Sequence, residues 1–190
     1  LTNVNTPGYK FQDIIQSTME SAPMLNYSGG ANLDQRQNIG NFVFGNQVDM
    51  VYKNFEQGIL SKSDKATDFA LVGNGFFAVE REEGLAFTRN GNFTINDDNI
   101  LVTMEGYPVM GVDTFGNITP ININDQNFMV DNRGNILNQG LSFLIADFDD
   151  YQALVSQGDT LFVSEAGYNV IEGEISQGYL EQSNVQIADE

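Results

Sequence analysis

DFALVGNGFFAVEREEGLAFTRNGNFTINDDNILVTMEGYPVMG, residues 68–111, decides the fold class of this 190-residue chain. Short runs of β-branched and aromatic residues, such as FFAVE, LAFTR and NFTIN, alternate there with Gly, Asn and Asp. Runs of about four to eight such residues between turn-forming residues are typical of β-strands. Asn and Gly accept the positive φ angles of tight turns at low cost. The stretch therefore predicts antiparallel strands joined by short hairpins.

The same pattern continues on both sides of this stretch, from NFVFG at residues 41–45 to EISQGYLEQ at residues 174–182. We therefore predict a mainly β domain over residues 39–182, with antiparallel sheets and little room for βαβ crossovers. Within it, DDYQALVSQG at residues 149–158 could form a single helical turn.

The N-terminal part differs from this pattern. LTNVNTPGYK at residues 1–10 has the composition of a turn or a helix end, because Pro7 and Gly8 disfavour continued helix. Residues 9–20 predict a short amphipathic helix, with an extended segment as the alternative, because the apolar residues near Ile14 fall on one helical face. The polar stretch that follows reads as a loop or crossover, so residues 1–38 are expected to form a linker.

At the C-terminal end, residues 183–190 (SNVQIADE) predict the start of a helix. Ser183 or Asn184 could be its N-cap, because their side-chain oxygens can accept hydrogen bonds from the first backbone amides of a helix.

Composition excludes several function classes. Eight Lys and Arg face 26 Asp and Glu, which gives a net charge of −18. Such a chain repels phosphate backbones and anionic membranes, so nucleic acid is not an expected partner. The chain has no Cys and no His. Zinc therefore lacks its usual nitrogen and sulfur ligands, and His- or Cys-dependent catalytic triads cannot form. We expect no metal and no cofactor.

Gly73-x-Gly75-x-x-Ala78 loosely matches the dinucleotide-binding fingerprint. That fingerprint needs a helix directly after it, because the pyrophosphate rests on the helix N-terminus. FFAVERE follows instead and reads as a strand, so we interpret residues 73–75 as a hairpin turn.

Acidic groups could suggest calcium or glycoside chemistry. NDDN at residues 96–99 and DNRGN at residues 131–135 lack the full ligand spacing of a calcium loop. Paired carboxylates can hydrolyse glycosides. Acidic clusters lie at Asp147, Asp149 and Asp150, and at Glu80, Glu82 and Glu83. Because acids are so numerous, solvated turns explain these clusters more simply.

Three segments together resemble the rod and hook proteins of the bacterial flagellum, which are axial subunits. They are NVNTPGYK at residues 3–10, the central stretch at residues 68–111, and GYLEQSNVQIADE at residues 178–190. In that family the first segment closes a long N-terminal helix, the second builds the central β domain, and the third leads into a C-terminal helix. The resemblance covers nearly the whole chain and implies that the two terminal segments lie close together.

Within the family, residues 42–77 are most similar to the distal rod protein, with its proximal-rod relative next. The hook protein carries an inserted domain for which the segment between Met110 and Phe128 leaves no room. The resemblance implies a structural subunit with no catalysis, which polymerises with copies of itself and with other axial proteins into a tube that transmits torque. It also implies a location in the basal body outside the cytoplasm, and passage through the flagellar export apparatus without a cleaved signal peptide. A hook-type subunit and, from another class, a secreted carbohydrate-binding β module remain alternatives.

Two groups of residues stand out, the first because of the resemblance and the second because of the roles that its residues have in turns and in the core. The family motifs at the terminal segments, expected to serve assembly, are Asn3, Asn5, Thr6, Pro7, Gly8, Tyr9, Glu181, Ser183, Asn184 and Val185. The turn and core residues expected to maintain the fold are Gly75, Phe76, Phe77, Thr88, Arg89, Gly91, Phe93, Gly106, Tyr107 and Pro108. Arg89 is one of eight basic residues, so we expect it to have an acidic or carbonyl partner.

Overall fold

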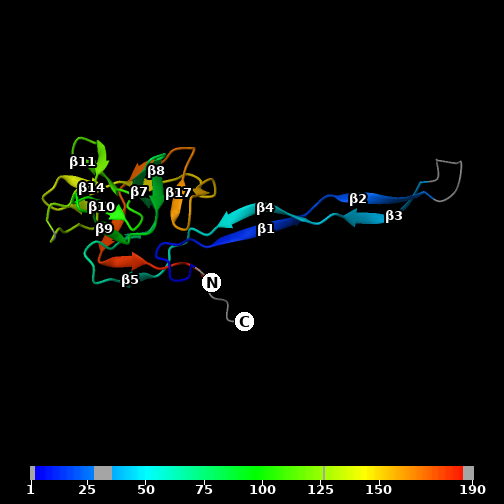
Figure 1. Ribbon diagram of the computed structural model, residues 1–190, viewed down its shortest axis with the longest axis horizontal. Coiled ribbons are helices and arrows are strands. Elements are labelled where there is room, and N and C mark those ends of the chain that lie inside the picture. The colour runs from blue at the N-terminus through cyan, green and yellow to red at the C-terminus, as the bar shows by residue number, and fades with distance from the viewer. Residues whose placement is uncertain (1–2, 28–35, 126, 186–190) are drawn as a thin grey trace. The chain divides into compact units, whose positions relative to one another are not determined.

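The computed structural model describes residues 3–27, 36–125 and 127–185. The regular secondary structure of these residues consists of β-strands alone, in antiparallel sheets with short hairpins (Figure 1). The predicted mainly β fold is therefore confirmed. The described residues contain no helix that could cross a membrane. The chain divides into two compact units, unit 1 with residues 1–11 and 53–190, and unit 2 with residues 12–52.

Unit 2 is a ribbon made from two pairs of strands. The outer strands β1 and β4 pair with each other, and so do the inner strands β2 and β3. Their bounds are β1 Gln12–Thr18, β2 Ser21–Tyr27, β3 Arg36–Val43 and β4 Asn46–Lys53. The ribbon is therefore two strands wide in both pairs.

Unit 1 contains a six-stranded antiparallel sheet at its centre. In spatial order its strands are β16 Val155–Ser156, β17 Leu161–Val163, β8 Gly84–Thr88, β7 Phe76–Arg81, β15 Ile145–Asp147 and β18 Asn169–Ile171. A four-stranded sheet follows the order β12 Ile118–Pro120, β11 Met110–Asp113, β14 Leu141–Phe143 and β13 Asn135–Ile136.

Three two-stranded sheets complete unit 1. They pair β9 Phe93–Ile95 with β10 Leu101–Thr103, β6 Phe69–Val72 with β19 Glu174–Gln177, and β5 Leu60–Lys62 with β20 Tyr179–Glu181. The last two pairs join segments more than a hundred residues apart in the chain, so the C-terminal part of unit 1 is held by its N-terminal part.

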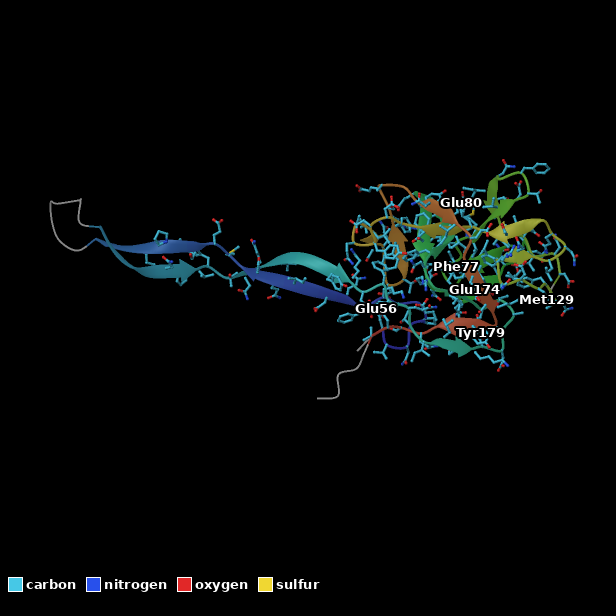
Figure 2. The ribbon with its side chains drawn as sticks, turned by 180° about the vertical axis from the view of Figure 1, so that it is seen from behind. Glu56, Phe77, Glu80, Met129, Glu174 and Tyr179 are labelled. Atoms are coloured by element: carbon cyan, nitrogen blue, oxygen red, sulfur yellow. The ribbon has the colours of Figure 1, made fainter. Side chains whose placement is uncertain are left out.

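The core lies on both faces of strand β7, because its side chains alternate between two apolar clusters. Phe77 and Val79 belong to one cluster, and Phe76 and Ala78 belong to the other. Figure 2 shows Phe77 within the unit and Glu80, on the same strand, at its surface. A strand buried on both faces explains the continuous apolar run FFAV, which differs from the alternation of a half-exposed strand.

The helix predicted for residues 9–20 is wrong, and the extended alternative is correct. Residues 12–18 form β1, whose backbone groups pair with β4. An amphipathic helix buries its apolar face against a core. Here Ile14 and Ile15 are exposed, and these β-branched residues favour a strand.

Residues 21–40, expected to be a loop, contain β2 and most of β3, while residues 28–35 lie outside the described part. The expected domain boundary between residues 38 and 39 falls inside β3, and the observed units divide near residues 12 and 52 instead. β2 and β3 pair with each other, so their backbone groups are satisfied locally. The expected helix start at residues 183–190 has no regular structure up to Val185, and the remainder lies outside the described residues.

The hairpin expected at residues 73–75 is also wrong, although FFAVER is a strand as predicted. β6 pairs with β19, and β7 pairs with β8 and β15, so residues 73–75 connect two different sheets. The possible helical turn at residues 149–158 is a single turn in which the Leu154 amide donates to the Tyr151 carbonyl at 3.3 Å, and strand β16 follows directly.

Candidate functional site at the two terminal segments

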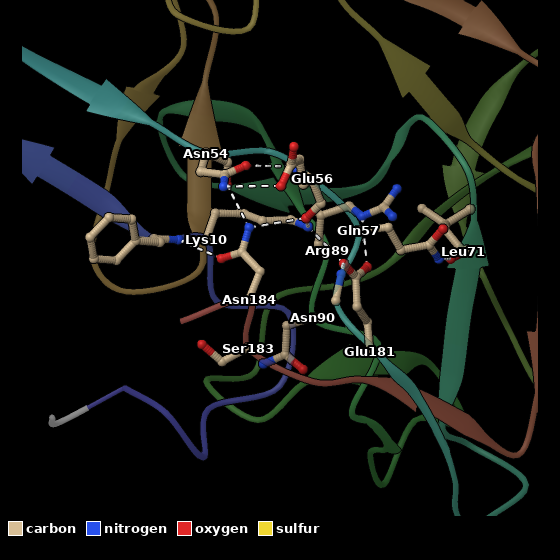
Figure 3. A network of polar contacts seen from close by, with 12 residues as sticks. Lys10, Asn54, Glu56, Gln57, Leu71, Arg89, Asn90, Glu181, Ser183 and Asn184 are labelled. Atoms are coloured by element: carbon tan, nitrogen blue, oxygen red, sulfur yellow. Dashed lines mark hydrogen bonds and ion pairs between the residues drawn. The ribbon is translucent and has the colours of Figure 1, made fainter. Parts of the chain in front are cut away.

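The N-terminal and C-terminal segments of unit 1 lie against each other, as the sequence analysis expected. The Gly8 amide donates to the Glu181 carbonyl at 2.8 Å, and the Asn184 amide donates to the Tyr9 carbonyl at 3.4 Å. Strand β20 leads into this contact from its pairing with β5. The place where both segments meet the β domain is therefore one site, shown in Figure 3.

A buried ion cluster lies at the centre of this site, and we call Lys10, Arg89 and Glu181 the anchor. Glu181 Oε1 accepts from Lys10 Nζ at 2.6 Å, and Glu181 Oε2 accepts from Arg89 Nε at 2.9 Å. All three side chains are at most 4% exposed. The anchor therefore ties one residue of each terminal segment to the end of strand β8.

Every member of the anchor has further polar partners. The Gly58 amide donates to Glu181 Oε1 at 2.8 Å, and Lys10 Nζ donates to the Glu56 carbonyl at 2.7 Å. Arg89 Nη1 donates to two carbonyls, those of Gly73 at 2.8 Å and Gly75 at 2.7 Å. Buried charges are stable only when they are paired and hydrogen-bonded in this way.

The anchor holds two basic groups against one carboxylate. Burial lowers the pKa of Lys10, and the nearby charge and hydrogen bond of Glu181 oppose this effect only in part. The positive charge of Arg89 lowers the Lys10 pKa further. Lys10 is therefore easier to deprotonate in the folded protein than in the unfolded chain.

Beside the anchor, the side chain of Asn184 also connects the two terminal segments by hydrogen bonds. Its Oδ1 accepts from the Phe11 amide at 2.7 Å, and its Nδ2 donates to the carbonyls of Asn54 at 2.8 Å and Glu56 at 3.0 Å. An amide has both donors and acceptors, so one Asn side chain can link three chain segments. The hydroxyl of Ser183 accepts a hydrogen bond from the Val185 amide at 3.3 Å, which holds the backbone on both sides of Asn184.

Close backbone approach at this site requires glycine. Gly8 has a φ of +67°, and a Cβ there would lie 2.4 Å from the Asn90 nitrogen. A Cβ on Gly58 would lie 2.0 Å from the Gln182 carbonyl oxygen. The terminal segments therefore pack against the β domain with no space for side chains at these two positions.

The other family-motif residues form the turns before Gly8. Thr6 Oγ1 donates to Asn3 Oδ1 at 3.4 Å, and the Tyr9 amide donates to the Thr6 carbonyl at 3.2 Å. Asn5 and Pro7 lie in the same series of turns. The turn-like composition of LTNVNTPGYK thus corresponds to turns in its described residues.

The residues expected to maintain the fold are spread through unit 1. Phe76, Phe77 and Phe93 are core residues, and Tyr107 packs at the edge of the core beneath Arg81. Buried Thr88 accepts from the Asn90 amide, and Pro108 bridges to Val102. Gly75 and Gly106 have positive φ angles, and Gly91 closely approaches the carbonyl of Phe69. Of this group, only Arg89 belongs to the anchor. It has both kinds of partner that were expected, the carboxylate of Glu181 and a backbone carbonyl, that of Gly75.

Sequence reasoning missed Lys10 as a site residue. It directly follows the motif residues Thr6–Tyr9, and its side chain is 1% exposed. The available signal was the scarcity of basic residues, which is the same argument that picked out Arg89.

The acidic loops have structural roles. Asp113 and Asp131 each begin a hairpin turn and accept two backbone amides and one Asn side chain. These hydrogen bonds, chiefly from Asn117 and Asn135, lower the pKa of both carboxyls. Among the described residues there is no cluster of three acidic side chains that could hold a metal ion.

Of the expected acidic clusters, Asp147 has the most specific contact. It accepts from the Tyr151 hydroxyl at 2.5 Å. Burial and this hydrogen bond raise the pKa of Tyr151 to about 12. Asp149 accepts from Asn169, and Asp150 accepts from the Gln152 amide, so these carboxylates stabilise loops.

A cleft of about 440 Å³ opens beside the anchor, and its walls combine apolar and amide groups. It is lined by Phe11, Asn54, Glu56, Gln57, Gly58, Ile59, Ser183, Asn184 and Val185. All of these residues belong to unit 1. The cleft is therefore bordered by Phe11 on one side of the chain and by the described end of the C-terminal segment, residues 183–185.

Together the fold and the anchor define a class: a β-structured structural protein whose terminal segments are fixed side by side on the β domain. The family model described as "Flagellar hook protein FlgE/F/G D1 domain" matches residues 70–139. The flagellar basal-body rod protein FlgF of Caulobacter vibrioides is 31% identical over 195 residues, covering 98% of this chain and 74% of that protein. The rod protein FlgG of Buchnera aphidicola subsp. Schizaphis graminum is 33% identical over 212 residues, covering 100% and 78%.

The chain belongs to the flagellar basal-body rod protein family and is a structural subunit of the flagellar basal body. FlgG of Borreliella burgdorferi, at 30% identity over 212 residues, supports the same assignment. Because these relatives are rod proteins over the full length of the chain, the hook-type alternative is not favoured. FlgF and FlgG match at nearly equal identity, so identity does not decide between these two rod proteins.

Proposed function

We propose that this chain polymerises with copies of itself and with other axial proteins into the rod, and that the rod transmits torque without any catalysis by this subunit. Membership of the rod protein family supports the assembly with other axial proteins. The anchor supports the proposal physically, because a force applied to either terminal segment reaches the β domain through hydrogen bonds and ion pairs at Lys10, Glu181 and Asn184. We further propose that the distal rod type fits best, and that the subunit is exported without a cleaved signal peptide.

Unit 2 is the observation that carries the assembly proposal. A two-stranded ribbon is at best marginally stable alone in water. Phe44 is 71% exposed, and it packs edge-to-face on Phe42 with ring centroids 5.1 Å apart. Further exposed large apolar residues of the ribbon are Ile14, Ile15, Met19, Met24, Val43, Val48, Val51 and Tyr52. Such a surface is stabilised when a neighbouring protein covers it.

The test is motility and rod assembly in cells whose only copy of the gene encodes Phe42→Ser together with Phe44→Ser. We expect loss of swimming and rods that stop at this subunit, with normal amounts of the subunit. The matched control is Phe115→Ser, which removes a Phe that is 89% exposed on a hairpin of unit 1. Normal rods in the ribbon variant would overturn the proposed role of unit 2. Abnormal rods in both variants would show that apolar exposure in general, and not the ribbon, is what assembly requires.

A further inference from the structure

The sequence contains two Asn-Gly dipeptides, Asn74-Gly75 and Asn90-Gly91. Such dipeptides can deamidate without an enzyme. The backbone nitrogen of the Gly attacks the side-chain amide carbon of the Asn, and the resulting cyclic adduct loses ammonia to give a five-membered succinimide. Water then opens the ring at either carbonyl and gives aspartate or isoaspartate. The reaction needs an Asn side chain that is free to turn toward the next nitrogen.

The surroundings of Asn74 leave its side chain free. Asn74 is exposed, and its side chain has no hydrogen bond with the residues that the structure describes. It lies in the connection between β6 and β7, which belong to different sheets, so no ladder holds it. A Cβ on the preceding Gly73 would meet no atom within 4 Å, which shows open space on this side of the turn.

The surroundings of Asn90 restrain it. The side-chain oxygen of Asn90 accepts a hydrogen bond from the backbone amide of Asn92 at 3.0 Å. The backbone amide of Asn90 donates to Thr88 Oγ1 at 3.0 Å. Its backbone is covered by Gly8, on which a Cβ would lie 2.6 Å from the Asn90 Cα atom. The following Gly91 is packed against the Phe69 carbonyl. Ring closure at Asn90 therefore requires the terminal segment to move away first.

We propose that Asn74 is a site of spontaneous deamidation in the folded protein, and that Asn90 is protected by the terminal segment. This inference is independent of the proposed role in assembly. The attacking nitrogen is more reactive after it loses its proton, so the rate increases with pH. Gly75 is buried, and a Cβ there would lie 2.7 Å from Ile145 Cγ2, so the movement of that nitrogen is limited and the rate stays below that of the unfolded chain.

The modification changes the anchor because Asn74 lies between the two carbonyls that bind Arg89. Gly73 and Gly75 both accept from the same guanidinium nitrogen, at 2.8 and 2.7 Å. An isoaspartate adds one backbone carbon between these two acceptors, so both can no longer hold their positions. Gly75 has little freedom to adjust, because a Cβ there would already lie 2.7 Å from Ile145 Cγ2. The isoaspartyl form should therefore bind Arg89, and through it Glu181, less firmly.

The experiment is incubation of the folded protein at mildly alkaline pH, followed by peptide mapping over time. Trypsin releases residues 66–81, a peptide in which Asn74 is the single Asn. Asn90 lies in the tryptic peptide of residues 90–133, and fragmentation of that peptide locates changes at Asn90. We expect the deamidation mass shift at Asn74 and at least tenfold slower change at Asn90. In denaturant, where the fold no longer protects Asn90, we expect comparable rates at both sites. Labelling with an isoaspartate-specific methyltransferase should mark Asn74 in the aged folded protein.

One variant links the chemistry to the anchor. Asn74→Gln should abolish the labelling and should prevent the fall in melting temperature on ageing. An equal or faster change at Asn90 in the folded protein would overturn the proposal. So would an Asn74 that stays unchanged while the denatured chain converts.

Discussion

Glu181 and Lys10 lie 171 positions apart in the chain, yet their side chains form an ion pair of 2.6 Å that is almost fully buried. The same carboxylate binds Arg89 at 2.9 Å, so one acidic side chain serves both buried cations of the anchor. Neither pair depends on local sequence. The terminal segments and the end of strand β8 must all be in place before Glu181 has its partners, which makes this residue a sensitive probe of how the subunit holds its ends.

Glu181→Gln should be strongly destabilising. It leaves Lys10 and Arg89 without an anionic partner in a site that excludes water, and removal of one member of a buried ion pair costs about 3–5 kcal/mol. Urea unfolding measures the change. The matched control is Glu83→Gln, because Glu83 pairs with Arg81 but its side chain is 75% exposed. That variant should cost less than about 1 kcal/mol. Equal costs for the two variants would show that Glu181 does not anchor the segments.

Lys10→Met should lower the free energy of unfolding by only about 1–2 kcal/mol at neutral pH. The loss is smaller than for Glu181→Gln because Glu181 keeps Arg89 and the Gly58 amide as partners. The pH dependence gives the sharper test. Burial lowers the pKa of Lys10, so between that value and the ordinary value of 10.5 the unfolded chain binds more protons than the folded protein. The stability that Lys10 contributes therefore increases as pH rises through this window.

The advantage of the wild type over Lys10→Met should accordingly grow as the pH rises from neutral toward 10.5, the ordinary pKa of a Lys side chain. Tyr151 titrates in both proteins alike, so its contribution cancels in the difference. Urea unfolding of both proteins at several pH values measures this difference. A difference that shrinks with rising pH would mean that the Lys10 pKa is raised by Glu181 more than it is lowered by burial.

The sequence predicted those features of the fold that depend on neighbouring residues, namely the strands and the turns between them. Residues 68–111 have the turn residues and the β-branched and aromatic runs of antiparallel strands, and the strands β7 to β10 lie there. It also indicated that Arg89 needs a partner. It did not predict which partner, because Glu181 follows Arg89 by 92 positions and meets it only after the sheets have formed.

The failed predictions share one physical cause. The helix expected near Ile14 and the hairpin expected at Asn74-Gly75 were inferred from patterns within a few residues. Their structures are set by distant partners, β4 for the first and β19 for the second. An apolar stripe indicates that a face will be covered, but it does not say whether the cover comes from the same chain. Among the described residues of the ribbon, large apolar side chains such as Ile14, Phe44 and Val48 remain exposed within this chain.

The carboxylates of Asp113 and Asp131 should contribute to acid unfolding. Hydrogen bonds, chiefly from Asn117 and Asn135, lower the pKa of both groups. Stability from such groups is present above their ordinary pKa and is lost as pH falls through the lowered value. The double variant Asp113→Asn and Asp131→Asn should therefore lose less stability than the wild type as the pH falls through and below 3.8, the ordinary pKa of an Asp side chain, as melting temperatures would show.

A third turn shows that Asn is compatible with this geometry. Asn96 Oδ1 accepts from the Asp98 amide at 3.0 Å and from the Ile100 amide at 2.9 Å, in the same pattern as the two Asp residues. The double variant should therefore keep its hairpins and its circular dichroism spectrum. If its melting temperature falls with acid as steeply as that of the wild type, other carboxylates control acid unfolding.

Gly91→Ala should be among the most destabilising single changes in unit 1. A Cβ at this position would lie 1.7 Å from the Phe69 carbonyl oxygen, at the start of strand β6. No rotamer relieves this contact, because the clash is between backbone atoms and the β-carbon itself. The backbone of β6 would have to move, and Phe69 lies in the main core cluster. We expect a cost of roughly 3–5 kcal/mol, measured by urea unfolding.

Gly106→Ala separates steric overlap from backbone strain. Gly106 has a φ of +93°, but a Cβ there would meet no atom within 4 Å. The change should cost about 1–2 kcal/mol, which is the strain of an L-residue in that conformation. The expected order of stability is wild type, then Gly106→Ala, then Gly91→Ala. If Gly106→Ala is the worse of the two, the contact between residue 91 and Phe69 is more relaxed than described, and the strained turn before Tyr107 matters more to the fold.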